Sequence, residues 1–353
     1  MLDEEIKKEI NKCSRCALCF QSCPIFQIKK DENSTCRGLI RKLAGFEQNI
    51  LSKKEIKKDL KICLGCGKCK LNCPSKINTT NIFAYKNAVF YPSKLNQKIF
   101  LGLKLLPLKI LYFFNFFKKK RKTLKTKNQK EIYFKGCVAN SQHKTTFLDE
   151  NLAVPDFSCC GLPYFLGGDL ESYKKAKEKN IELIKKADTV VFDCATCFSA
   201  VKDYFLEDDL NFKKLIFIDD YIFQKAKDKK FKLKKNSKYF NKTITFHKPC
   251  HLDKNQFEKI ENFLSNIENL NYKKLENPDL CCGFGGSYFL FHPIIALKIN
   301  LKKALEIKKS KADLILSACP SCTIGLRFSQ IISLNFKKTL ELRDFIDKEL
   351  ILE

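Results

Sequence analysis

Residues 13–24 read CSRCALCFQSCP, and residues 63–74 repeat the same spacing as CLGCGKCKLNCP. Each stretch has three cysteines with two residues between neighbours, a fourth after three intervening residues, and a proline directly behind it. Thiolates are the soft ligands that hold iron–sulfur clusters, and this spacing puts three of them on one tight loop. The two stretches therefore predict an N-terminal domain built around metal–sulfur sites.

The spacing matches that of two-cluster bacterial ferredoxins, in which the fourth cysteine of each run ligates the other cluster. We therefore predict two [4Fe–4S] clusters within residues 13–73. By this rule one cluster is held by Cys13, Cys16, Cys19 and Cys73, and the other by Cys63, Cys66, Cys69 and Cys23. Zinc is the alternative, because all-cysteine zinc sites also exist, but these usually use pairs of C-x2-C.

Ten further cysteines form two sets of five, and each set contains an adjacent cysteine pair followed by glycine. The first set is Cys137, Cys159, Cys160, Cys194 and Cys197; the second is Cys250, Cys281, Cys282, Cys319 and Cys322. Of the nineteen cysteines only Cys36 stands outside these patterns. A lone small thiol of this kind is more often a packing residue than a reactive one.

The sequence from residue 131 onward repeats itself, which indicates a duplicated unit. The offset is 113 residues at the first cysteines, 122 at the double cysteines and 125 at the closing C-x2-C pairs. Short apolar runs predict strands, and runs with apolar residues at helical spacing predict helices. The strands are expected at 132–134, 189–192, 244–246 and 314–316, and the helices at 172–186 and 294–309. Parallel strands gather ligands at their carboxyl ends, where the cysteines follow, so each set is expected to share one pocket.

The fold class that we expect is therefore α+β with several domains. A helical two-cluster domain of the bacterial ferredoxin type occupies residues 1–91 and contains a Lys-rich helix at 51–61. A linker follows at 92–130. Two α/β units with parallel sheets complete the chain, at 131–232 and 233–353.

Composition excludes several classes of protein. The charge of +27 comes from 66 Lys and Arg against 39 Asp and Glu spread along the whole chain, so it indicates a compositional bias. With four His and no C-x2-C…H-x3-H pattern, nucleic-acid binding is not expected. The charged start has no signal-peptide core, so we expect a cytoplasmic protein with metal-binding thiols in place of disulfides.

The linker contains an apolar stretch at 99–117 followed by a basic run at 118–122. Lys104, Pro107 and Lys109 interrupt the stretch, and a central Lys costs about 2.5–3.5 kcal/mol in a spanning helix. We therefore expect no membrane span. A helix packed between the domains and a peripheral contact of 99–122 with the inner face of the cytoplasmic membrane remain as two alternatives.

The five-cysteine sets resemble the cysteine-rich CCG domain family, and the whole chain resembles the glycolate oxidase iron–sulfur subunit. It is also similar to the C subunit of anaerobic glycerol-3-phosphate dehydrogenase. The segment Thr35–Arg41 resembles that family's Pro-Arg-Gly-Arg segment, with Cys36 in place of proline. The related units of heterodisulfide reductase use five cysteines to hold a non-cubane [4Fe–4S] cluster, so the resemblance implies one or two further clusters here. The second unit is favoured, because only 21 residues separate Cys137 from Cys159, against 30 between Cys250 and Cys281.

The chain has no G-x-G-x-x-G fingerprint for a flavin or nicotinamide. The resemblance implies an electron-transfer subunit of a glycolate- or lactate-type dehydrogenase, which passes electrons from an FAD-containing subunit toward the quinone pool. The alternative is a heterodisulfide-reductase-like thiol or quinone reductase with catalysis at the second five-cysteine set. A zinc-stabilised scaffold is the third class.

Overall fold

The computed structural model describes residues 4–90, 130–141, 148, 151–205, 213–226, 230–285 and 288–352. Most of the linker expected at 92–130, with the apolar and basic stretch at 99–122, lies outside these residues. Contacts group the described residues into two compact units. Of these residues, the first unit draws on 4–90, 163–173, 283–285 and 288–299, and the second on the other described residues.

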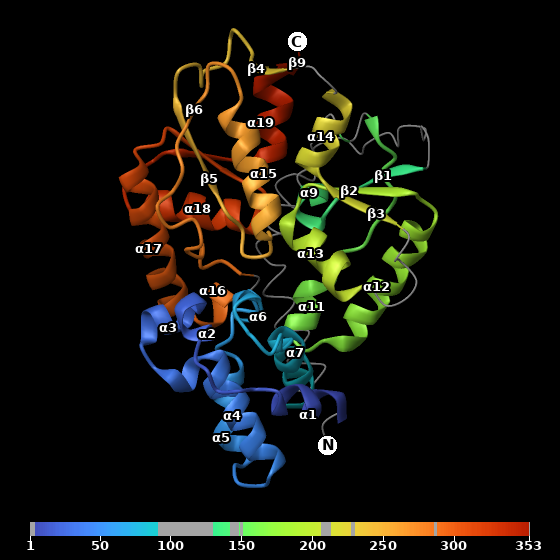
Figure 1. Cartoon of the computed structure of the whole chain (residues 1–353), viewed down its shortest axis with the longest axis vertical. Helices are drawn as coiled ribbons and strands as arrows, with labels where there is room; N and C mark the ends of the chain where they lie inside the picture. Colours follow the sequence, from blue (N-terminus) through green and yellow to red (C-terminus); the bar gives the residue numbers. More distant parts are fainter. Residues whose placement is uncertain are drawn as a thin grey trace. The chain divides into compact units, whose positions relative to one another are not determined.

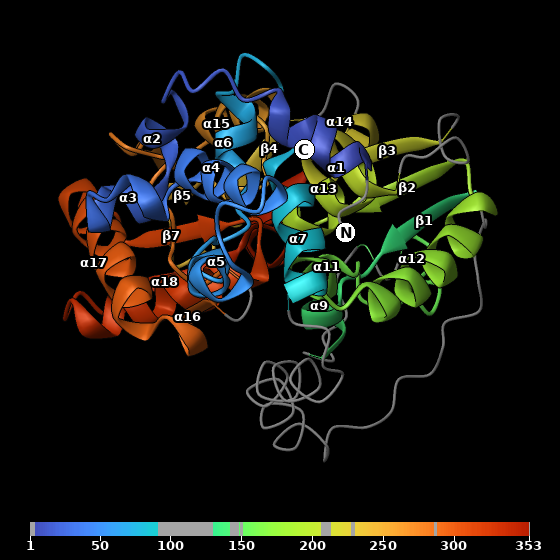
Figure 2. The same cartoon turned by 90° about the horizontal axis from the view of Figure 1, so that it is seen from below.

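The first unit is helical, and within residues 4–90 the structure describes no strand (Figure 2, blue and cyan). Its elements are α1 (Glu4–Asn11), α2 (Cys19–Ser22), α3 (Pro24–Lys29), a short 3-10 turn (Glu32–Ser34), α4 (Cys36–Glu47), α5 (Lys53–Leu60), α6 (Lys68–Leu71) and α7 (Thr79–Phe90). Helix α5 confirms the helix predicted at 51–61, and Ser52 and Glu55 form a capping box at its start. The core includes Leu39, Leu43 and Ile82, each at most 1% exposed.

Two short segments from the repeated part of the chain also belong to this first unit. They carry α11 (Leu162–Leu166) and α16 (Tyr288–Phe291). The Asn87 amide donates to the Leu166 carbonyl at 3.2 Å, and the His292 imidazole donates to the Lys61 carbonyl at 3.0 Å. Both segments follow a Cys-Cys-Gly motif, so each repeat contributes its next turn to the ferredoxin-like unit.

The second unit contains two parallel sheets of similar order, as predicted (Figure 1). The first sheet is β1-β2-β3, formed by Glu131–Phe134, Thr189–Phe192 and Lys214–Phe217. The second is β6-β5-β7-β8, formed by Asn271–Tyr272, Thr243–His247, Leu314–Ser317 and Lys338–Glu341. The four predicted strands are confirmed as β1, β2, β5 and β7. The flanking strands β3, β6 and β8 were not predicted.

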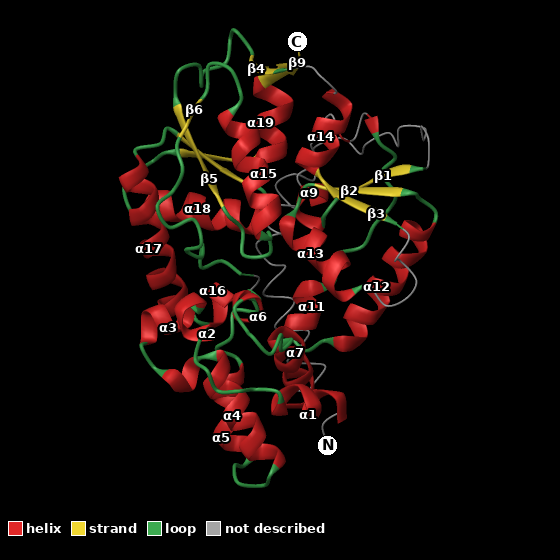
Figure 3. Ribbon diagram, viewed as in Figure 1, coloured by secondary structure: helices red, strands yellow, loops and turns green. Residues whose placement is uncertain are grey.

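Helices follow the strands in the same order in both repeats. In the first they are α9 (Cys137–Ser141), α12 (Leu170–Lys185), α13 (Ala195–Tyr204) and α14 (Ile218–Ala226); in the second they are α15 (Lys254–Ser265), α17 (Pro293–Ser310), α18 (Pro320–Ile332) and α19 (Leu342–Glu349). Helices α12 and α17 confirm the two helices that were predicted. An antiparallel pair, β4 (Phe231–Leu233) with β9 (Leu350–Leu352), joins the segment before the second repeat to the end of the chain. All strands of Figure 3 belong to this unit.

The first sheet ends in a run of buried aromatic rings that pack against one another, two pairs stacked and one edge-to-face. Phe134 lies 4.3 Å from Phe157 and 5.1 Å from Phe192, measured between ring centroids, and Phe192 lies 5.5 Å from Phe198. Buried ring pairs of this kind stabilise a core beyond the apolar area that they remove from water. The run fixes the carboxyl ends of β1 and β2, from which cysteines follow.

Among the described residues, no helix has the length and apolar content needed to cross a bilayer.

Candidate metal centres

The two ferredoxin-like loops share one backbone shape. In the second loop Gly65 and Gly67 have φ of 65° and 69°, the left-handed region that favours glycine. The equivalent residues of the first loop, Arg15 and Ala17, take φ of 60° and 66° although they carry side chains. The same turn of the chain therefore presents the three closely spaced cysteines in both loops.

Each predicted four-cysteine set lines one open pocket. The first pocket is lined by Cys13, Cys16, Cys19 and Cys73, and the second by Cys63, Cys66, Cys69 and Cys23; Cys69 also reaches the first pocket. The fourth cysteine of each run thus lies in the pocket of the other run.

Hydrogen bonds reach the sulfur atoms from nearby backbone and hydroxyl groups. The Gly65 N–H donates to Cys63 Sγ at 3.4 Å, and the Thr79 hydroxyl lies 2.9 Å from Cys69 Sγ. The Arg37 backbone N–H donates to Cys19. Donors of this kind orient metal ligands and favour their thiolate form.

Sequence reasoning missed Cys36, which is 8% exposed and lies against both pockets. Its thiol is hydrogen-bonded to Cys19 and to Cys69, which belong to different sets. The hydrogen bond from Cys36 is the main cause that lowers the pKa of Cys19 to about 6, and it also lowers the pKa of Cys69. The only sequence signal was its place at the first turn of a helix between the two loops.

The first five-cysteine set gathers at the carboxyl end of the first sheet. The Cys160 thiol is hydrogen-bonded to Cys159 and Cys197, and the Cys137 thiol to Cys159. The hydrogen bond with Cys159 is the largest cause that raises the pKa of Cys137 well above its usual value. Gly161 of the Cys-Cys-Gly motif has φ of 81°, and its counterpart Gly283 has φ of 76°, which explains the glycine in both motifs.

The second set gathers in the same way around the second sheet. Cys250 Sγ lies 3.8 Å from Cys281 Sγ, and Cys282 Sγ lies 3.4 Å from Cys322 Sγ. Cys319 is the N-cap of α18, and its thiol is hydrogen-bonded to Cys322. In the described residues all ten cysteines therefore lie with members of their own predicted set.

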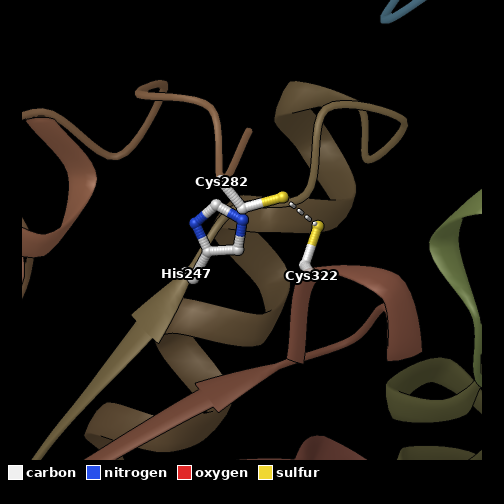
Figure 4. A group of neighbouring side chains, drawn as sticks. All are labelled: His247, Cys282 and Cys322. Atoms are coloured by element: carbon white, nitrogen blue, oxygen red, sulfur yellow. Dashed lines mark hydrogen bonds between the residues drawn. The ribbon is translucent and has the colours of Figure 1, made fainter. Parts of the chain in front are cut away.

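His247 is a second residue that sequence reasoning missed. It ends β5 and is fully buried. One nitrogen of its imidazole and the Sγ atoms of Cys282 and Cys322 all lie within 4.8 Å of one another (Figure 4). In the first repeat the aligned residue is Phe134, because both end the first strand and pair with the end of the next. The sequence did contain one sign of this residue. A histidine stands three positions before Cys250, where the equivalent strand of the first repeat has phenylalanine.

The two five-cysteine sets meet through one residue of each. The Cys194 thiol is hydrogen-bonded to Cys319, and the Ala195 N–H donates to the Ala318 carbonyl at 2.8 Å. The Thr196 hydroxyl lies 3.5 Å from Cys319 Sγ and 3.3 Å from His251 Nδ1. The duplication thus places equivalent strand ends of the two repeats face to face.

A buried ionic network also joins the repeats directly beside Cys194. Arg343 donates to Asp193 and to Glu341, both at 2.6 Å, and the Tyr133 hydroxyl donates to Asp193 at 2.8 Å. The Arg343 and Asp193 side chains are 3% and 1% exposed. A buried charge of this kind is tolerated when it is paired and hydrogen-bonded, so the network holds the strand end that carries Cys194.

The donor chemistry of all four sites is that of soft ligands. The sets consist of thiols, His247 lies beside the second five-cysteine set, and backbone or hydroxyl groups contact several of the sulfur atoms. Thiolate sets of this type suit iron–sulfur clusters, and the open pockets of the first unit leave space beside the sulfur atoms.

Two family models match the chain. A 4Fe-4S dicluster domain matches residues 9–77, and a cysteine-rich domain matches residues 132–202 and again 244–327. The chain therefore belongs to the iron–sulfur proteins that combine a 4Fe-4S dicluster domain with cysteine-rich CCG domains. Its motifs are those of an electron-transfer protein.

Curated relatives match about half of the chain. It is 30% identical over 179 residues to the B subunit of the fumarate reductase (CoM/CoB) of Methanothermobacter marburgensis, covering 50% of this chain and 35% of the relative. It is 30% identical over 219 residues to the D subunit of the dihydromethanophenazine:CoB–CoM heterodisulfide reductase of Methanosarcina acetivorans, covering 55% and 53%. It is 27% identical over 184 residues to lactate utilization protein A of Shouchella clausii, covering 48% and 73%. The chain thus spans about a third to a half of the length of the first two relatives.

Proposed function

We propose that this chain is the iron–sulfur electron-transfer subunit of a dehydrogenase complex that oxidises a 2-hydroxy acid such as glycolate or lactate. A separate FAD-containing subunit would take the hydride, and a quinone would accept the electrons. The observation that carries the proposal is the pair of cysteine pockets in which each run supplies its fourth thiol to the other. The similarity to lactate utilization protein A supports this class of substrate.

The residues of the chain would bind and tune the cofactors. The eight cysteines of residues 13–73 would hold two [4Fe–4S] clusters, and one or both five-cysteine sets would hold a further, non-cubane cluster. When bound, such clusters supply one-electron transfer, and the protein sets their spacing and potential. Helix starts, backbone N–H groups and hydroxyls around the sulfur atoms would favour the thiolates.

The test is the reduction of the clusters by substrate in the intact complex. The tagged full chain is purified anaerobically with its partners, the flavin is identified, and visible absorption is followed after glycolate or lactate is added. We expect bleaching of the iron–sulfur absorption in the complex and none in the isolated chain. Propionate, which lacks the 2-hydroxyl group, is the matched control and should have no effect.

The second candidate is a thiol or quinone reductase with its reaction at the second five-cysteine set. Similarity to the D subunit of the heterodisulfide reductase favours it, as does the position of His247 beside Cys282 and Cys322. The isolated chain would then reduce a disulfide or a quinone with an artificial electron donor. Turnover without any flavoprotein would contradict the proposed subunit role.

A further inference from the structure

Cys36 occupies the boundary between the two ferredoxin-like sites. It is the first residue of α4, where the Thr35 hydroxyl caps the helix by accepting from the Gly38 N–H at 3.2 Å. The helix start therefore fixes the position of the Cys36 side chain. That side chain lines the pocket of each four-cysteine set, together with Cys69 and Thr79.

The thiol of Cys36 contacts one predicted ligand from each set. It is hydrogen-bonded to Cys19 of the first set and to Cys69 of the second. Each of these cysteines also has a donor of its own, the Arg37 backbone N–H for Cys19 and the Thr79 hydroxyl for Cys69. Cys36 is thus the donor that the two sites have in common.

A thiol carries one proton, so it donates only one hydrogen bond at a time. Cys19 and Cys69 would be thiolates when they bind iron, and thiolates only accept hydrogen bonds. Rotation of the S–H group about the Cβ–Sγ bond of Cys36 would direct the proton to the sulfur of either Cys19 or Cys69. The proton should favour the site with the greater negative charge, which is the site that has gained an electron.

We propose that Cys36 is a hydrogen-bond donor shared by the two clusters, and that it raises the reduction potential of whichever cluster is reduced first. The inference rests on the proposed binding of a cluster by each four-cysteine set. Hydrogen bonds to ligand sulfurs stabilise the more negative, reduced cluster. Once one cluster holds the donor, the other is reduced without it, so Cys36 widens the gap between the two potentials.

The test is a potentiometric titration of the anaerobic full chain, followed by the electron paramagnetic resonance of the reduced clusters. We expect Cys36→Ala to lower the higher midpoint potential and to leave the lower one nearly unchanged. A hydrogen bond to a charged group is worth about tenfold in an equilibrium, which is about 59 mV for a one-electron couple. Cys36→Ser keeps a donor at the same place, and its two potentials should remain separated as in the unmodified chain.

Iron content is measured first, because it distinguishes a failure of the proposed ligand sets from a failure of the role of Cys36. An unmodified chain without iron would overturn the proposed ligand sets, and the role of Cys36 with them. If iron is present in all three proteins, equal potentials in Cys36→Ala and the unmodified chain would overturn the role of Cys36 alone. An equal fall of both potentials, or loss of clusters only in Cys36→Ala, would also contradict a shared donor.

Discussion

At the scale of single residues, the first cysteine loop holds two side chains in a backbone conformation that favours glycine. Arg15 and Ala17 repeat the left-handed angles of Gly65 and Gly67. For a residue with a Cβ this conformation costs about 1–2 kcal/mol. The loop keeps its shape because the spacing of the cysteines requires it.

Ala17→Gly should therefore stabilise the folded chain by about 1 kcal/mol, since glycine removes the strain but adds freedom to the unfolded chain. The thermal unfolding midpoint of the cluster-loaded protein, followed by circular dichroism, measures this. Gly67→Ala is the matched control, because an added Cβ there meets only Thr80 Oγ1 at 3.9 Å, and it should lower the midpoint. A lower midpoint for Ala17→Gly would show that the angle of Ala17 carries no strain.

The eighteen grouped cysteines were predicted from spacing, because ligand chemistry leaves a local pattern in the chain. Cys36 and His247 were not, because their roles depend on neighbours distant in the sequence. Cys36 contacts Cys69, which is 33 positions further along the sequence, and His247 lies beside Cys322, which is 75 positions further along. A single cysteine has no spacing that could reveal such a neighbour, and for His247 the one signal was its difference from Phe134, the equivalent residue of the first repeat.

At the scale of elements, the strands β1, β2, β5 and β7 were predicted, and the edge strands β3, β6 and β8 were not. All four of β2, β3, β7 and β8 have four residues, but β2 and β7 have no exposed residue, while β3 and β8 each begin with an exposed lysine. β6 has two residues, and its counterpart in the first repeat is a single bridge between Ile132 and Ala153. Such short pairings arise from the sheet already formed, so local periodicity gives little sign of them.

The helix α14 carries a buried carboxyl that makes stability depend on pH. Asp219 is fully buried, and the Gln256 amide of α15 donates to both carboxylate oxygens at 2.5 and 2.7 Å. Burial, followed by the charge of Asp220, raises the pKa of Asp219 to about 7. Between its unfolded pKa of 3.8 and about 7, the folded chain holds the proton more tightly than the unfolded chain.

The contribution of Asp219 to stability should therefore be present below about pH 4 and fall as pH rises to about 7, by at most about 1.4 kcal/mol per pH unit. Asp219→Asn keeps the shape and removes the titration. Urea unfolding of both proteins across this range measures the difference in their free energies of unfolding. If the two free energies change with pH in parallel, Asp219 is not the group responsible.

At the scale of the whole molecule, duplication explains why ten cysteines form two similar sites. The strand orders β1-β2-β3 and β5-β7-β8 are equivalent, and a cysteine follows each of β1, β2, β5 and β7. The repeat was visible in the sequence, and so was the grouping of each set. The contact of Cys194 with Cys319 and the network of Arg343 with Asp193 were not, because each joins residues of different repeats.

The central claim is that the cysteines hold iron–sulfur clusters, and metal analysis tests it most directly. The full chain is purified anaerobically, and iron, acid-labile sulfide and zinc are measured per protein molecule. We expect about eight iron atoms from the ferredoxin-like sets, with sulfide in equal amount, and more iron if the five-cysteine sets are filled. Stoichiometric zinc without iron would contradict the account.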